Sequence, residues 1–514
     1  MTEQVGEASI ALLPLTGVEA RRAARNAGAL AIARILSSGA LFIWQILLAR
    51  LLGEAQFGIY STIGPLYTIA ATAASFSIGV IVIREVARKP ENAGKYLSVT
   101  LLIQTLFAMI AYIGLNLAGL ALGYSPELRA LAAIAAISLF LDLTGSMAYD
   151  QLIAQEKMVG ASVIEIAHML IRIALALLLV SAGFGLMGVY IATLITGIGR
   201  LMVLWWLMLR TGVHPSWPAN WGIGIPLLLA AAPLALSAVI NSAYTHLDRL
   251  VSTSVLTEQD TAHINAAFVI VTGTVEILNT TILVALFPLM ARLYKPGGTR
   301  GENESFYFLV QKLAYFALLI GLPVALTATV FSAEVAVPIF GENFRPTADV
   351  LRIMIWYAAL TMIANVFAQA LMSANQQGRY VVVRAVGLVV KLALAIFLLP
   401  RVGVVGAALS SVVAEAGVML ALGWMVPLNW RARLRQFARL ALVCAASLLA
   451  LLALGAILPV LGMIGGVLVY AAGVLFAGAL AGDDYDLLYR IVAAFPGGAQ
   501  VRKYWKRDVK LTWE

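Results

Sequence analysis

Charged residues are scarce in this sequence. Only 12% of its 514 residues are Asp, Glu, Lys or Arg, and 61% are hydrophobic, whereas about a quarter of a typical soluble domain is charged. The single cysteine, Cys444, excludes an intrachain disulfide. The four histidines are dispersed, and no metalloprotease, P-loop or nucleophile-elbow motif occurs. The sequence therefore predicts no catalytic residues, no metal site and no bound cofactor.

Long apolar runs take the place of charge. They are continuous, and each has roughly the 20 residues that a helix needs to cross the hydrocarbon core of a bilayer. We therefore expect an all-α polytopic membrane protein with about fourteen transmembrane helices. The expected spans are 27–50, 58–82, 97–121, 128–148, 161–181, 185–209, 225–245, 262–289, 306–331, 347–371, 380–400, 402–426, 437–458 and 461–481.

The formal charge of +9 follows membrane topology and does not indicate a nucleic-acid partner. If the N-terminus is cytoplasmic, 24 of the 35 Lys and Arg residues fall on the cytoplasmic side and 5 fall on the opposite side. Cytoplasmic loops of membrane proteins are enriched in Lys and Arg. We therefore expect both the N-terminal tail (1–26) and the C-terminal tail (482–514) to be cytoplasmic.

The chain divides into two halves of six spans. The segment 210–224, rich in Pro, Gly and Trp, predicts a cytoplasmic linker between an N-lobe (27–209) and a C-lobe (225–426), followed by two further spans within 427–481. "FGLMGVYIATLITG" (184–197) and "VGVVGAALSSVVAE" (402–415) share Gly-x-x-Gly at an offset of 218 residues. Because six spans separate the copies, the lobes would be related by a pseudo-two-fold axis along the membrane normal.

One glycine pattern invites a different interpretation. "GFGLMG" (183–188) matches the dinucleotide-binding pattern G-x-G-x-x-G, which requires a preceding strand in a soluble βαβ unit. Here the pattern joins two predicted membrane spans. It therefore indicates a tight turn with close helix packing.

Ionisable residues inside the spans are the candidate functional residues, because charge in lipid is costly and usually faces a cavity. Each base also has an alternative to a functional role in a cavity. The side chains of Arg34 and Arg200 could extend to the membrane interface, and those of Arg172 and Lys391 could form structural ion pairs with acids. The candidates for substrate binding are Arg34, Arg172, Arg200, Arg352 and Lys391, and those for ion coupling or charge pairing are Asp142, Glu165, Glu276 and Glu415.

One helix face combines several of these groups. Glu165, His168 and Arg172 recur at helical spacing in "EIAHMLIRIALALLLV" (165–180), whose other residues are aliphatic apart from small alanines. Such a face is expected to line water between two lobes, where Arg172 would meet an anionic headgroup.

Three stretches resemble bacterial polysaccharide flippases, Wzx-like members of the multidrug/oligosaccharidyl-lipid/polysaccharide exporter superfamily. They are "LARLLGEAQFGIYS" (48–61), "FPLMARL" (287–293) and "IFGENFRPTADVLRIM" (339–354). The resemblance implies export of an undecaprenyl-diphosphate-linked oligosaccharide across the bacterial inner membrane by alternating access, coupled to an H⁺ or Na⁺ gradient. It also implies basic cavity residues at the sugar-phosphate end, which by position would be Arg34, Arg172 and Lys391, and a glycan polymerase and export machinery as further partners.

Two other functions stay open at this point. A multidrug or cation exporter of the same architecture would need an acidic lumen, whereas bases outnumber acids inside the spans. A membrane glycan polymerase or ligase would need a substantial outer loop to hold acceptor sugars, and the predicted outer connections are short.

Overall fold

The computed structural model describes the backbone of residues 17–428 and 430–480, and the side chains of residues 38–276, 290–428, 430 and 433–480. Within these ranges every regular element is a helix, and eleven helical segments are long and apolar enough to cross a membrane. Two of the eleven segments, Ser38–Arg88 and Met158–Leu209, are twice the length that one span needs. The all-α polytopic fold predicted from the sequence is thus confirmed.

The first half of the chain begins with a broken helix. Helix α1 (Gly17–Ser75) changes direction at Gly53, whose φ of 70° and ψ of −179° are not helical, so α1 supplies two spans. The remaining helices of this half are α2 (Ile78–Arg88), α3 (Ala93–Ala121), α4 (Pro126–Ala154), α5 (Met158–Leu179), the short π-helix η2 (Val180–Phe184) and α6 (Gly185–Leu209).

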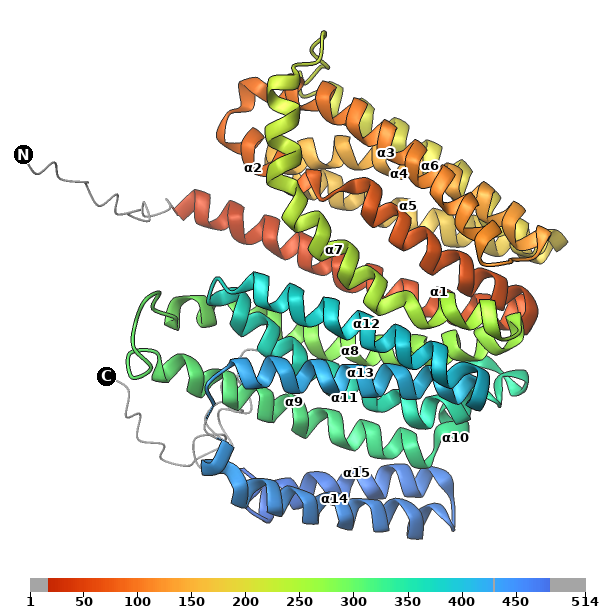
Figure 1. The fold of residues 1–514 in the computed structure, drawn as a ribbon, viewed down its shortest axis with the longest axis vertical. Coiled ribbons are helices and arrows are strands. Elements are labelled where there is room, and N and C mark those ends of the chain that lie inside the picture. Colours follow the sequence, from red (N-terminus) through yellow and green to blue (C-terminus); the bar gives the residue numbers. More distant parts are fainter. Residues whose placement is uncertain (1–16, 429, 481–514) are drawn as a thin grey trace, which may run out of the picture. The chain divides into compact units, whose positions relative to one another are not determined.

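The second half repeats this pattern and extends it (Figure 1). Its helices are α7 (Trp221–Val255), α8 (Glu258–Leu293), α9 (Glu304–Val330), α10 (Ser332–Phe340), α11 (Thr347–Ser373), α12 (Gln377–Val402), α13 (Val404–Met425), α14 (Leu434–Gly455) and α15 (Pro459–Phe476). Short 3-10 turns η1 (Pro90–Asn92), η3 (Glu342–Phe344) and η4 (Trp430–Arg433) occupy three of the connections.

The structure confirms the predicted spans and adds two features. Each predicted span except the second coincides with one helix or with one arm of α1. The second span is interrupted at Phe76 and Ser77, which adopt left-handed φ values of 48° and 52°, so that α2 is a separate helix. The other addition is α10, nine residues long, which lies in a segment predicted as a loop.

Compactness divides the chain into two units. Unit 1 comprises Met1–Leu52 and Ile63–Ser242, and unit 2 comprises Gly53–Thr62 and Ala243–Glu514. In unit 1, α4 packs against α2, α3 and α6. In unit 2, α11 is the central helix and packs against α8, α9 and α13, while α14 and α15 form a hairpin beside α9. The predicted lobe boundaries at 209, 225 and 426 were drawn from the order of the spans along the sequence, whereas the two units are defined by compactness. These boundaries and the two predicted tails therefore stay a prediction.

The predicted repeat is visible in backbone geometry. Gly185 is the first residue of α6, with φ 53° and ψ −141°, and Gly403 directly precedes α13, with φ 60° and ψ −141°. Both positions need glycine, since L side chains rarely adopt positive φ. Three residues later, Gly188 and Gly406 each lie against the end of the preceding helix, with no room for a Cβ. The motif "GFGLMG" is therefore a tight turn, as predicted.

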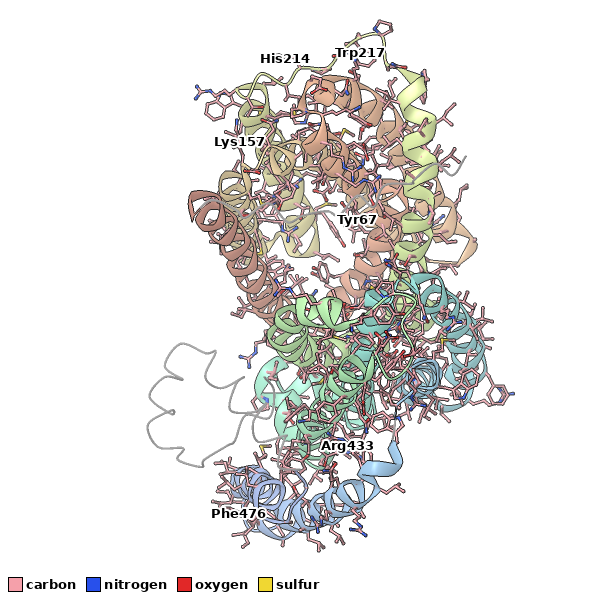
Figure 2. All side chains as sticks on the ribbon, turned by 90° about the vertical axis from the view of Figure 1, so that its left-hand side faces the viewer. Tyr67, Lys157, His214, Trp217, Arg433 and Phe476 are labelled. Atoms are coloured by element: carbon pink, nitrogen blue, oxygen red, sulfur yellow. The ribbon has the colours of Figure 1, made fainter. Side chains whose placement is uncertain are left out.

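Apolar side chains cover the outside of the helices. Leu442 is 71% exposed, Ile457 75% and Phe476 87%. In water such faces would be aggregation sites, but in lipid they match the solvent. The segment between α6 and α7, which contains His214 and Trp217 (Figure 2), is held to the start of α3 by a hydrogen bond from the Ser216 N–H to the Gly94 carbonyl.

The break in α1 gives a stability prediction. Substitution of Gly53 by Ala places a Cβ in a backbone conformation that is almost exclusive to glycine, at a cost of about 1–3 kcal/mol. We expect a lower apparent midpoint of thermal unfolding in detergent. The matched control is Gly64→Ala in the same helix, because both glycines have open space around the Cβ position and Gly64 is helical. Equal midpoints for the two variants would contradict this account of the break.

Candidate functional site

Unit 1 holds a polar cluster between otherwise apolar helices. The Arg200 side chain on α6 is only 9% exposed, and its Nε and Nη2 donate to Glu165 Oε1 on α5 at 2.8 and 2.7 Å. Its Nη1 lies 3.8 Å from Asp142 Oδ1 on α4. Gly145, one turn after Asp142, leaves the space that this guanidinium occupies. One arginine therefore joins three helices through two carboxylates.

The carboxylates of this cluster are accessible, unlike the guanidinium between them. The Asp142 side chain is 42% exposed and the Glu165 side chain 31%. Asp142 also accepts a hydrogen bond from the hydroxyl of Tyr67 on α1, whose position among the helices of unit 1 is seen in Figure 2. The cluster thus faces an accessible space on one side.

Arg172 stands apart from these pairs. It lies two turns after Glu165 on α5 and is partly buried, and among the described residues it makes no ion pair or hydrogen bond. His168 lies between them with a buried Nε2 that has no hydrogen-bond partner. Arg172 is therefore a partly buried guanidinium of unit 1 that has no carboxylate partner among the described residues.

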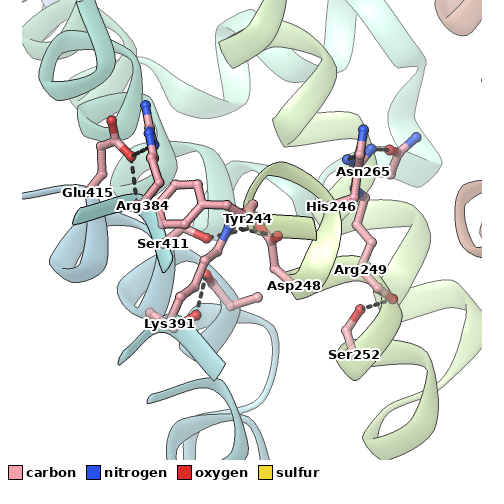
Figure 3. Close-up of polar contacts among 12 residues, drawn as sticks. Tyr244, His246, Asp248, Arg249, Ser252, Asn265, Arg384, Lys391, Ser411 and Glu415 are labelled. Carbon is pink, nitrogen blue, oxygen red and sulfur yellow. Dashed lines mark hydrogen bonds and ion pairs between the residues drawn. The ribbon is translucent and has the colours of Figure 1, made fainter. Parts of the chain in front are cut away.

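Unit 2 contains a second, fully enclosed polar cluster (Figure 3). Lys391 on α12 is 0% exposed, and its Nζ donates to Asp248 Oδ1 on α7 at 2.9 Å and to the Tyr244 carbonyl at 2.9 Å. The second oxygen of Asp248 accepts from Ser411 on α13 at 2.9 Å. Three helices converge on this pair, and structural pairing, the alternative raised for Lys391, is what the structure displays.

Tyr244 connects this pair to another one. Its hydroxyl donates to Glu415 Oε2 at 2.7 Å, and Arg384 Nη1 donates to the same oxygen at 3.0 Å. The Arg384 and Glu415 side chains are 5% and 0% exposed. The predicted acid Glu415 is therefore held by an arginine of α12 and a tyrosine of α7 (Figure 3).

A third buried cation in unit 2 has only neutral partners. Arg249 Nη1 donates to Asn265 at 2.9 Å, Nη2 meets His246, and the guanidinium lies 4.1 Å from the centre of the Phe268 ring. Its Nε is buried without a partner, and no carboxylate within the described residues pairs with it. Ring and amide contacts stabilise a guanidinium partly, through cation–π attraction and hydrogen bonding.

Of the remaining predicted residues, Arg352 has a partner outside both clusters. Arg352 on α11 is half exposed and pairs with Asp349 at 3.4 Å. Glu276 on α8 is partly buried and engaged in an interaction. Arg34 lies on α1, and its side chain is outside the described residues. Functional roles for the nine predicted residues stay predictions.

Sequence reasoning missed most of the unit 2 cluster. The predicted span 225–245 ends before Asp248 and Arg249, and Arg384, inside the predicted span 380–400, was not among the candidates, whereas all three lie buried inside helices. Helical spacing held a usable signal, because Tyr244 and Asp248 are four residues apart and Arg384 and Lys391 are seven apart, each pair on one helix face. In the described parts of the chain no group of three His, Cys, Asp or Glu residues could hold a metal ion.

Solved membrane transporters share this fold. The fold is similar to lipid II flippase MurJ in an inward closed conformation, with a TM-score of 0.71 and 15% identity, covering 87% of this chain and 98% of that chain. It is also similar to an inward-facing multidrug resistance MATE family transporter of the MOP superfamily, with a TM-score of 0.60, 16% identity and coverage of 77% and 97%. The chain thus has the two-lobe fold of these membrane transporters.

Residues 23–294 match the family model described as polysaccharide biosynthesis protein, so the chain belongs to that family. A curated relative, described as a probable low-salt glycan biosynthesis flippase of Haloferax volcanii, is 21% identical over 394 residues, covering 76% of this chain and 81% of the relative. The resemblance to polysaccharide flippases predicted from three short motifs is confirmed.

The buried Lys391–Asp248 pair generates a prediction. Lys391→Met leaves an uncompensated carboxylate in the core, which costs about 3–5 kcal/mol. We expect a large drop in unfolding midpoint, most of which the double variant Lys391→Met with Asp248→Leu restores, since an apolar pair of similar volume needs no counter-charge.

The control is the exposed pair Arg345–Glu342, with side chains 63% and 66% exposed. Arg345→Ala should leave the midpoint unchanged, because exposed ion pairs contribute little. A double variant as unstable as Lys391→Met alone would show that the pair contributes more than charge neutralisation.

Proposed function

We propose that this protein is a transporter that moves an undecaprenyl-diphosphate-linked oligosaccharide from the cytoplasmic to the periplasmic leaflet by alternating access. The observation that carries the proposal is the unit 1 cluster, where Arg172 and Arg200 lie between apolar helices and Arg172 has no carboxylate among the described residues. Membership in the polysaccharide biosynthesis protein family supports a glycan substrate.

The chemistry of the substrate fits an arginine site. A diphosphate diester carries about two negative charges, each of which would cost several kcal/mol at the bilayer centre. A guanidinium grips phosphate oxygens in bidentate fashion and stays charged when desolvated. Arg172 would bind the diphosphate directly. Arg200 would add positive potential while Asp142 and Glu165 hold it in place.

The other predicted binding residues enter the proposal with different requirements. Arg34 and Arg352 would contact the glycan or its phosphate from α1 and α11. Lys391 is enclosed with Asp248, so a direct contact with substrate would require the helices around it to separate. We propose for Lys391 a contribution to the positive potential of its lobe.

The cellular setting follows from the same proposal. Both termini would be cytoplasmic and the membrane would be the bacterial inner membrane, consistent with the distribution of Lys and Arg along the chain. A glycan polymerase and export machinery would receive the product, because the translocated unit is an intermediate of polysaccharide assembly.

We further propose coupling to an H⁺ or Na⁺ gradient through one of Asp142, Glu165, Glu276 and Glu415. Asp142 and Glu165 are the accessible acids of this set. A proton or Na⁺ that binds to one of these carboxylates would weaken its ion pair with Arg200. Flux of glycan lipid unchanged by either gradient would remove this part of the proposal.

A multidrug exporter is the second candidate, since a MATE family transporter shares the fold. The exposed carboxylates Asp142 and Glu165 are groups that a cationic drug could contact. A polymerase or ligase is less well supported, because the connections on the predicted outer side are short, as at Gly403 between α12 and α13.

Leaflet translocation in proteoliposomes tests the proposal. A fluorescent undecaprenyl-diphosphate glycan is followed with a membrane-impermeant quencher. We expect Arg172→Ala to lower the protein-dependent rate by tenfold or more, because a charged hydrogen bond to phosphate contributes about 1.5–3 kcal/mol. Arg172→Lys should retain part of the rate, since it keeps the charge without the bidentate geometry.

The control variant is Arg401→Ala, at the exposed end of α12, where the guanidinium bonds only to its own helix at the Phe397 carbonyl. It should translocate at the wild-type rate. Movement of a cationic dye in place of the glycan lipid would favour the multidrug exporter, and full activity of Arg172→Ala would contradict the arginine site.

A further inference from the structure

Asp150 is an acid within a described helix whose carboxyl group the structure leaves without a hydrogen-bond or ion-pair partner. It lies on α4, is partly buried, and makes no hydrogen bond or ion pair with the described residues. Five other acids of the spans are engaged: Asp142 and Glu165 by Arg200, Asp248 by Lys391, Glu415 by Arg384, and Glu276 by an interaction of its own. A desolvated carboxylate without partners is costly, whereas the neutral acid is not.

The structure makes room for this side chain. Gly79, in the first turn of α2, faces the Asp150 carboxyl group so closely that a Cβ there would lie 2.8 Å from Asp150 Cγ and 3.1 Å from Oδ1. The helix break at Phe76 and Ser77 brings α2 to this position. The carboxyl group therefore packs against the backbone of α2 at Gly79, and it lies two helical turns beyond Asp142 on α4.

The charged groups around Asp150 come from several helices. From α6, Arg200 is the cation that interacts electrostatically with it, and the neighbouring Tyr149 on α4 interacts electrostatically with both Asp150 and Glu165 of α5. The ionisable groups of α2 and α3 near the same end interact elsewhere: Arg84 with Glu85, Tyr96 with both, and Lys95 with Asn92.

Charge balance depends on Asp150. Arg172 and Arg200 carry two positive charges, and Asp142 and Glu165 carry two negative charges. With His168 neutral, these described groups sum to zero when Asp150 is protonated and to one negative charge when it is ionised. An anion bound beside Arg172 and Arg200 would add further negative charge and would therefore raise the free energy of the state in which Asp150 is ionised.

We propose that Asp150 is a proton-binding residue whose protonated form is favoured by an anionic diphosphate bound at Arg172 and Arg200, so that substrate and proton bind together. The inference rests on the proposed function for its anion, and it names a residue outside the four acids predicted from the sequence. By reciprocity, the proton strengthens substrate binding as much as the substrate strengthens proton binding. Substrate affinity therefore falls as pH rises and Asp150 ionises.

The proton site itself is tested without any substrate. Infrared spectra of the full-length protein in nanodiscs are recorded across pH, following the carbonyl stretch of protonated carboxylic acids. A band that titrates in wild type and is missing in Asp150→Asn is the expected result. Asp150→Glu should retain a titrating band at a shifted position, and Gly79→Ala should displace the band by pushing the carboxyl group aside.

The matched control is Glu127→Gln, an exposed acid in the first turn of the same helix. Its spectra should keep the wild-type band. A band present in Asp150→Asn, or no titrating band in folded wild type, would overturn the proton site whatever the protein transports.

The linkage is tested by binding. The probe is a short-chain prenyl diphosphate sugar, a diphosphate diester whose own charge does not change near neutral pH. In wild type its dissociation constant should rise about tenfold as Asp150 ionises, because a further negative charge that interacts with Arg200 opposes the binding of an anion there. In Asp150→Asn the constant should be independent of pH and close to the low-pH wild-type value.

The two proposals fail separately. Binding with the wild-type pH dependence in Asp150→Asn would overturn the linkage while leaving the flippase intact. Absence of binding at any pH, with the infrared band present in wild type and lost in Asp150→Asn, would count against the diphosphate substrate and leave the proton site standing.

Discussion

The free-energy cost of charge inside an apolar helix bundle is the constraint on which the rest of this structure depends. Four cations described within spans are stabilised by defined partners: Lys391 meets Asp248, Arg384 meets Glu415, Arg200 meets two carboxylates, and Arg249 is held by an amide, an imidazole and an aromatic ring. Breaking such a pair by removing one partner leaves an unpaired charge in the core. The pairs therefore fix which helices are neighbours: α7, α12 and α13 in unit 2, and α4, α5 and α6 in unit 1.

Small residues allow the helices to come close enough for these pairs to form. Gly145 makes space for the Arg200 guanidinium and Gly79 for the Asp150 carboxyl group. At Gly185 and Gly403 the two halves of the chain use the same left-handed turn to return the next helix against the last one. Small residues at helix contacts are how membrane helices pack, since lipid supplies no hydrophobic force between them. In each half, close helix packing at small residues is therefore what allows the charged side chains to reach one another.

The spans were predictable from the sequence because apolar length alone decides whether a helix can cross a bilayer. The repeat was predictable at 184–197 and 402–415 because its glycines serve backbone geometry. The helix breaks were harder to predict. Phe76 and Ser77 are not residues that favour left-handed φ, so the local sequence contains no signal for the start of α2. The pairing of acids and bases was not predictable, since Asp248 meets Lys391 across 143 positions of sequence. Asp150 was missed because a span edge placed at 148 put it outside the membrane segment.

The two clusters differ in a way that bears on their roles. In unit 2 the paired side chains are between 0% and 5% exposed, and each charge is met by an opposite charge or by several hydrogen bonds. Such a network is stable in one arrangement. It has few groups free to bind a ligand, because each new contact must first displace an existing one. In unit 1 the carboxylates are 31% and 42% exposed, Arg172 has no carboxylate, and Asp150 has no base beside it within hydrogen-bonding distance among the described residues. Charges that are incompletely matched and accessible respond to ions, which is the property that a binding site for an anion and a proton requires.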